Sequence, residues 1–143
     1  MRFLPGYKAT FLIVGSLFIF LSLMIFVRGL IPSMAEFKVP DSTLNSPHYF
    51  DAILWVYTHM MVMGLLIFTL AFSVPDRNKQ KWISILLLLI TSAYTFLDFR
   101  SSDSALGNGL YQGEASLIPA IISLFCSLMF CLTVIKFLGS KEI

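Results

Sequence analysis

Four long apolar runs constrain this chain more than any other feature. They occupy residues 9–27, 50–73, 82–99 and 116–138, and the first contains 19 residues without a charge. A helix of ~20 apolar residues spans the ~30 Å hydrocarbon core of a bilayer. We therefore predict an all-α membrane protein, an antiparallel four-transmembrane-helix bundle in which residues 1–143 form a single domain.

The composition agrees with a membrane environment. Hydrophobic residues make up 57% of the 143 residues and charged residues 13%, against ~25% charged residues in a typical soluble domain. The formal net charge of +2 is too small to indicate a nucleic-acid partner. The basic residues stand beside apolar runs, as lipid headgroups favour, so we predict the lipid bilayer as a partner and no nucleic acid.

The first apolar run has an alternative interpretation as a secretory signal peptide. Basic residues precede it, and Ser33-Met34-Ala35 resembles a small-x-small cleavage site. The apolar part of a signal peptide is ~7–15 residues long, which is shorter than this run, and Arg28 interrupts the approach to the cleavage site. We favour a retained first helix.

Three connecting segments follow from the runs. Segment 28–49 contains three prolines, and residues beside proline avoid the helical conformation, so no continuous helix is expected there. Pro47 suits the first turn of the second helix, where its missing N–H is not needed. Segment 74–81 is short and basic, which predicts that helices two and three are antiparallel neighbours. Segment 100–115 is rich in glycine.

Basic residues predict the orientation. Seven of the ten lie at the two ends or in segment 74–81: Arg2, Lys8, Arg77, Lys79, Lys81, Lys136 and Lys141. By the positive-inside rule both termini are cytoplasmic, and segments 28–49 and 100–115 lie outside. The bacterial inner (plasma) membrane is the expected location. Six of the eight acidic residues then fall on the outer side, so any binding site is expected to face outward.

Polar residues form a stripe on each of two helices. Asp51, Trp55 and His59 recur at i, i+4 and i+8 on the second helix, while Tyr94 and Asp98 share a face of the third. An ionisable group facing lipid at the bilayer centre costs ~2.5–3.5 kcal/mol on insertion scales, so the two stripes are expected to face each other. We predict a polar pocket between helices two and three, capped by segment 100–115.

His59 and Asp98 have alternative interpretations. His59 is either a proton carrier or ligand anchor, or a neutral imidazole bonded across helices to Tyr94, Thr91 or Thr95. Asp98 is a second candidate acid or base. Two outer residues, Asp98 and Arg100, orient an anionic or zwitterionic ligand, or else anchor helix three at the interface.

Metal and haem sites are not expected. His48 and His59 are separated by about 16 Å along an unbroken helix, and no metal-ligand motif such as HExxH occurs. A membrane haem would call for two facing histidines, and only His59 lies deep. Cys126 and Cys131 are interpreted as small apolar residues of a helix interior. We predict no cofactor and no metal.

Four hypotheses for function remain. The leading one is an outward-facing pocket that binds a small ligand, a lipid headgroup or a partner helix, through Asp51, His59, Tyr94, Asp98, Arg100, Asp103 and Glu114. The second is a membrane enzyme acting on a lipid or isoprenoid, with His59 or Asp98 as acid or base. The third is an accessory subunit with a membrane-protein partner, or a homo-oligomer. A proton-coupled transporter is a weaker fourth alternative.

Overall fold

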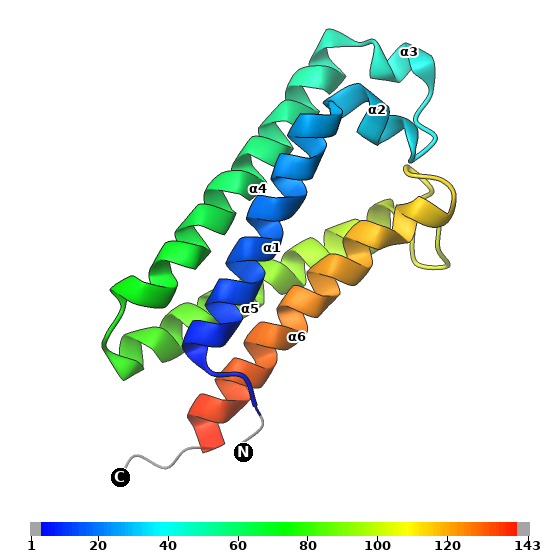
Figure 1. The fold of residues 1–143 in the computed structure, drawn as a ribbon. Helices are drawn as coiled ribbons and strands as arrows, with labels where there is room; N and C mark the ends of the chain where they lie inside the picture. Colours follow the sequence, from blue (N-terminus) through cyan, green and yellow to red (C-terminus); the bar gives the residue numbers. More distant parts are fainter. Residues whose placement is uncertain (1–3, 140–143) are drawn as a thin grey trace.

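The computed structural model describes residues 4–139, and within that range the chain is helical with no strand (Figure 1). Four stretches are long and apolar enough to cross a membrane. They are α1 (Tyr7–Arg28), α4 (Pro47–Ser73), α5 (Arg77–Ser101), and the 3-10 turn η1 (Glu114–Leu117) continued by α6 (Ile118–Gly139). The all-helical class and the four candidate membrane spans are confirmed.

The long helices extend beyond the apolar runs that predict them. Pro47 is the first residue of α4, as predicted, and Pro119 stands in the first turn of α6. Helix α5 begins five residues before the apolar run that predicts it. Asp76 caps it, with its Oδ1 accepting from the Lys79 N–H at 2.7 Å, so the predicted segment 74–81 contracts to three residues. A helix begins where a capping side chain accepts from its first backbone N–H groups. An apolar run marks only the part of the helix that lies in lipid.

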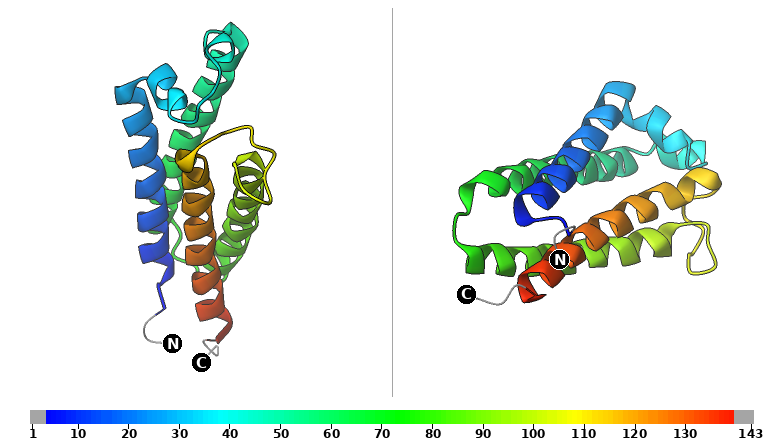
Figure 2. Two further views of the ribbon diagram at one scale, coloured as in Figure 1. Left: turned by 90° about the vertical axis from the view of Figure 1, so that its right-hand side faces the viewer. Right: turned by 60° about the horizontal axis from the view of Figure 1, so that its bottom comes forward.

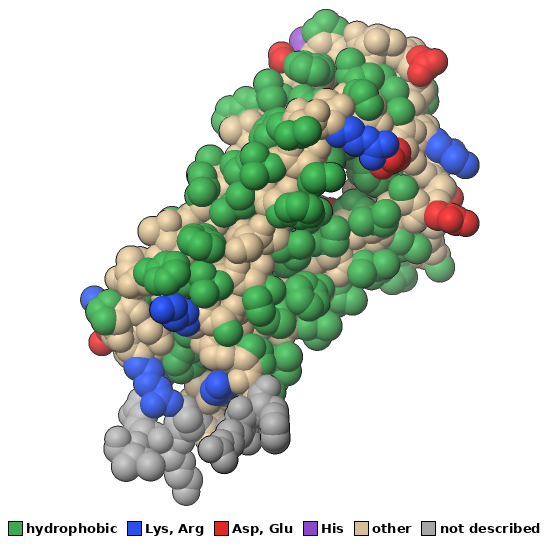
Figure 3. Space-filling model, in the orientation of Figure 1, with side chains coloured by type: hydrophobic (Ala, Val, Ile, Leu, Met, Phe, Trp, Pro, Cys, Tyr) green, Lys and Arg blue, Asp and Glu red, His purple; other side chains and the backbone are tan. Residues whose placement is uncertain are grey.

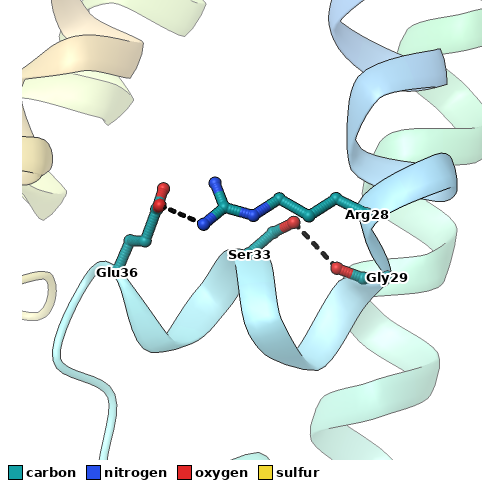
Figure 4. A network of polar contacts seen from close by, with 4 residues as sticks. All are labelled: Arg28, Gly29, Ser33 and Glu36. Atoms are coloured by element: carbon teal, nitrogen blue, oxygen red, sulfur yellow. Dashed lines mark hydrogen bonds and ion pairs between the residues drawn. The ribbon is translucent and has the colours of Figure 1, made fainter.

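The first outer connection contains two short helices rather than an open loop. They are α2 (Leu30–Ala35) and α3 (Asp41–Leu44). Gly29 separates α1 from α2 with φ +94°, a conformation that favours glycine. The Ser33 hydroxyl donates to the Gly29 carbonyl at 2.7 Å, and Arg28 forms an ion pair with Glu36 across α2 (Figure 4). These contacts tie α2 to the end of α1.

The long helices associate in two pairs. Helix α1 packs along α4, and α5 packs along α6, while the pairs touch each other chiefly through α1 and α6. The pairs lie close at the end where α1 begins and α6 ends, and they diverge toward the outer loops (Figures 1 and 2). Helices α4 and α5 scarcely pack directly. The prediction that a short turn makes them packed neighbours is therefore wrong, because each finds its partner across an outer loop.

Close backbone approach holds the α1–α4 pair together. A Cβ atom at Gly15 would lie 2.7 Å from the backbone nitrogen of Phe68, and one at Gly64 would lie 2.9 Å from the backbone nitrogen of Ile19. Small residues at membrane-helix interfaces permit such approach. Gly15 and Gly64 therefore mark the close contact between these two helices.

Polar contacts fix the two pairs at their common end. The hydroxyls of Thr10 on α1 and Thr133 on α6 meet at 2.6 Å in the interior. Nearby, Lys136 Nζ donates to the Leu4 carbonyl at 2.7 Å. Both cysteines are free thiols of α6, and Cys126 is buried. The helix pairs are therefore joined at one end and splayed at the other.

Candidate functional site

The stripe of Asp51, Trp55 and His59 lies on the outer surface of α4. All three side chains are exposed, and Trp55 is 76% exposed. Trp55 and His59 line a surface groove together with Leu54 and Thr58. Within residues 4–139 no hydrogen bond joins His59 to Tyr94, Thr91 or Thr95. The structure therefore places Asp51 and His59 away from the interior of the molecule.

The polar face of α5 meets α6. The Thr95 hydroxyl lies 3.0 Å from that of Ser127 on α6, and it also donates to the Thr91 carbonyl at 2.8 Å. Thr91 is buried and donates to the Leu87 carbonyl at 2.8 Å. Tyr94 is half-buried. Serine and threonine hydroxyls commonly connect helices in membranes, so this part of the predicted stripe stabilises the α5–α6 pair.

The remaining predicted charges lie on the surface of the outer end. Arg100, Asp103 and Glu114 are all exposed, and in the described part of the chain no ion pair joins Arg100 to Asp51, Asp103 or Glu114. The described residues also contain no group of three or more His, Cys, Asp or Glu side chains placed to hold a metal ion. These charges do not converge on one ligand site.

A different stripe of α4 faces inward. Tyr49, Ile53 and Tyr57 follow one another at i, i+4 and i+8, and the stripe continues as Gly64 and Ile67 deeper in the helix. Ile53 is 7% exposed, and both tyrosines pack against the outer hydrophobic cluster formed by Leu30, Met34, Val39, Leu44 and Ile53. Positions two residues apart lie about 200° apart around a helix, so this stripe is opposite Asp51 and His59.

Asp98, like Tyr94, is a predicted site residue that is partly removed from solvent. It is half-buried near the outer end of α5. Ser123 of α6, whose hydroxyl donates to the Ala120 carbonyl at 3.2 Å, lies within electrostatic range of the Asp98 carboxylate, as do Tyr57 and Tyr111. Side chains from α4, α5, α6 and the third connection thus lie in the same part of the outer half, and we call them the Asp98–tyrosine cluster: Tyr49, Tyr57, Asp98, Tyr111 and Ser123.

The two outer connections join above this cluster. The Gln112 N–H donates to the Phe37 carbonyl at 3.0 Å, and the Phe37 and Tyr111 rings contact each other in a tilted arrangement, with their centroids 5.2 Å apart and an interplanar angle of 53°. The Tyr111 N–H also donates to the Ser101 carbonyl at 3.0 Å, which folds the connection back over α5. Burial raises the pKa of Tyr111 above its ordinary value of 10.0, and the Asp98 carboxylate raises it further. This junction, formed by the Gln112–Phe37 backbone hydrogen bond and the Phe37–Tyr111 ring contact, is called the roof below.

One buried hydroxyl group of the outer half lacks a hydrogen-bond partner. The Tyr49 hydroxyl oxygen is buried and has no hydrogen-bond partner among the described residues. Nearly all buried polar groups in proteins have one. The surface is also hollowed between the α1–α2 side and the α6 side of the outer half (Figure 3). An unpaired hydroxyl and a half-buried carboxylate therefore occur in the region where the helix pairs diverge.

Sequence reasoning did not group the three tyrosines, although it predicted that segment 100–115, which contains Tyr111, caps a pocket. Tyr49 and Tyr57 carry a detectable signal, because they stand in helical register with Gly64, which predicts a close helix contact. Tyr111 carries no such signal, since its place depends on how a glycine-rich connection folds back.

The chain matches no protein-family model, no curated protein and no solved structure. Its function is therefore argued from the Asp98–tyrosine cluster and its surroundings.

Proposed function

We propose that this chain is a small ligand-binding protein of the membrane, with a pocket in the outer half between α4 and α5 and the 102–113 connection as its cap. The observation that carries the proposal is Asp98, a half-buried carboxylate near the outer end of α5 that forms no ion pair among the described residues. Intramembrane ionisable residues mark ligand and ion sites more often than structural ones. The unpaired Tyr49 hydroxyl adds a second polar group that a ligand would satisfy.

The proposed orientation places both termini in the cytoplasm of a bacterial inner membrane. Support comes from charge, because basic side chains lie at the end where α1 begins and α6 ends, whereas most acidic ones gather at the outer loops (Figure 3). A membrane-impermeant thiol reagent added to whole cells should label Asn108→Cys and spare Asn78→Cys, in a background carrying Cys126→Ser and Cys131→Ser. Labelling of Asn78→Cys from outside would show the opposite orientation and refute the proposed one.

Native mass spectrometry tests the pocket directly. The protein extracted in mild detergent should retain a small bound molecule that Tyr57→Leu loses. Trp55→Leu is the matched control, since it removes an aromatic ring two residues away on the opposite, exposed face of α4. The pocket is refuted when the wild type retains no added mass, or when both variants lose it equally.

A role as an accessory subunit or homo-oligomer is the second candidate. It is favoured by the exposed position of His59 near the middle of α4, in a groove with Trp55 and Thr58. A polar side chain at this depth gains from cover by another helix. His59→Leu should then release a partner, or reduce the oligomer mass measured by light scattering, while Asp51→Asn leaves both unchanged. Equal masses for the wild type and His59→Leu, with the same proteins retained, would rule this role out.

A further inference from the structure

The outward face of α4 exposes polar side chains in the middle of a membrane-spanning helix. Thr58 and His59 stand near the midpoint of α4, and both are exposed. Within residues 4–139 neither side chain forms a hydrogen bond. Ionisable side chains of membrane helices almost always face a bundle interior or a water-filled cavity. A second protein surface is therefore needed to take these two groups out of lipid.

A groove on the same face has room for a side chain of another molecule. Leu54, Trp55, Thr58 and His59 line it, and it encloses about 260 Å³. An apolar cavity of ~150 Å³ admits a benzene ring, so an aromatic side chain fits here. Helix α1 covers the opposite face of α4, at the close approach of Gly64, so the groove is open to a helix from outside the chain.

The depth of the polar pair selects a second copy of this chain as the partner. Two copies inserted in one membrane with the same orientation are related by a two-fold axis along the membrane normal, and most homo-oligomers have such closed symmetry. Equal residues of the two copies then lie at equal depth. A second copy therefore brings a hydroxyl and an imidazole to the depth at which the first exposes them, whereas any other protein would have to match that depth independently.

Symmetry also determines which groups meet. Successive residues lie ~100° apart around a helix, so Thr58 and His59 fall on either side of a line through Trp55 and Val62. When that line faces the axis, the Thr58 side of one helix meets the His59 side of the other, as flanking positions do in parallel coiled coils. A hydroxyl and a neutral imidazole can each donate and accept. Two equivalent hydrogen bonds can then form, one on each side of the axis.

We propose that two copies of this chain form a parallel dimer through the outward face of α4, with Thr58 of each copy hydrogen-bonded to His59 of the other. Trp55 and Val62 then lie nearest the two-fold axis. This inference rests on the second candidate role proposed above and names its partner. Asp51, the acidic residue of this face, lies two helical turns nearer the outer loops, where salt screens the repulsion between the copies.

Cysteine cross-linking in membranes tests the geometry, in a background carrying Cys126→Ser and Cys131→Ser. Val62→Cys should form a covalent dimer on oxidation. Val56→Cys is the matched control, because Val56 and Val62 are 57% and 55% exposed but lie ~120° apart around α4. It should cross-link at least tenfold more slowly. Equal rates at the two positions, or no cross-link at Val62→Cys, overturn the inference.

Energy transfer between labelled copies diluted in lipid vesicles tests the hydrogen bonds. His59→Leu removes both of them and should raise the dissociation constant about tenfold, whereas His59→Gln keeps a donor and an acceptor and should stay within about threefold of the wild type. Thr58→Val should match His59→Leu, and the double variant should lose little more than either, because both break the same pair. Additive losses, or an unchanged constant in His59→Leu, contradict the pairing.

The mass of the protein in mild detergent separates this inference from the role on which it rests. A mass of two chains, each of 16.1 kDa, supports the dimer. A single chain that retains a different protein, which His59→Leu releases, overturns the dimer and leaves the accessory role standing. A single chain that retains no protein overturns both.

Discussion

Replacing Gly15 by alanine tests whether backbone contact holds α1 against α4. The added Cβ would lie 2.7 Å from the backbone nitrogen of Phe68, 2.9 Å from its Cα and 3.0 Å from the carbonyl oxygen of Gly64. Comfortable contacts between heavy atoms are ~3.5 Å or longer, so the helices would have to separate by roughly 0.5–1 Å. Because the obstructing atoms belong to the α4 backbone, no side-chain rotation relieves the clash.

The cost follows from the contacts that this separation loosens. A gap of ~0.5–1 Å forfeits a quarter to a half of an attraction of ~0.1–0.2 kcal/mol per atom pair, and one large buried side chain makes ~40–60 such contacts. Phe11, Val14 and Phe18 flank Gly15 in the buried face of α1. Loosening the contacts of about one such side chain amounts to ~2 kcal/mol, within the ~1–3 kcal/mol typical of overpacked interiors.

We therefore expect Gly15→Ala to lower the free energy of unfolding by ~2 kcal/mol, measured by SDS titration in mixed micelles. Ser16→Ala is the control, since it alters the adjacent, exposed position of α1. Gly64→Ala should cost a similar amount, and the double variant should cost less than the two single losses together, because both open the same interface. A Gly15→Ala protein within about 0.5 kcal/mol of Ser16→Ala would refute the reasoning.

Three further predictions concern the ends of the molecule. Thr10→Val should lower the free energy of unfolding by ~0.6–1.7 kcal/mol, the value of interhelical hydrogen bonds in membranes, and should remove most of the effect of Thr133→Val, since their hydroxyls meet at 2.6 Å. Tyr111 has a raised pKa in the folded state, so above pH ~10 the unfolded chain loses this proton first and stability falls. The unfolding temperature of the wild type should therefore fall more steeply with pH above ~10 than that of Tyr111→Phe. Gly113 has φ +81° and ψ 179°, a conformation that costs other residues ~1–3 kcal/mol, so Gly113→Ala should accelerate hydrogen exchange at the Gln112 amide.

Each of these has a result that contradicts it. Additive losses for Thr10→Val and Thr133→Val would show that the two hydroxyls act separately. Parallel pH profiles for the wild type and Tyr111→Phe would remove the link between burial of Tyr111 and stability. Unchanged exchange at Gln112 in Gly113→Ala would show that the roof does not depend on the glycine.

The spans could be predicted from sequence because lipid imposes a minimum length on an apolar helix. The start of α4 could also be predicted, since Pro47 acts through its own backbone geometry rather than through its neighbours. The partner of each helix could not be predicted in the same way. The lipid-facing and inward-facing sides of a membrane helix are equally apolar, so the short turn between α4 and α5 suggested a pairing that the α1–α4 and α5–α6 contacts replace.

The residues of the candidate site could likewise be predicted only in part. Asp98 is predicted as a site residue because it is an acid at the end of an apolar helix, and in the structure it is half-buried in the outer half. Asp51 and His59 were selected by the same polarity, yet the inward face of α4 is set by the close approach at Gly64 and the packing of Ile53. Polarity indicates which residues could take part in chemistry, whereas the close helix approach at Gly64 determines which of them face the interior.

The division into two helix pairs also bears on biosynthesis. Helices α1 and α4 are both translated before α5, so the first hairpin can close before the second half of the chain exists. The link between the hairpins is only the short stretch from Val74 to Asp76. Severing it genetically and co-expressing the two halves should therefore yield an assembled molecule, joined through the meeting of Thr10 and Thr133 rather than through a peptide bond.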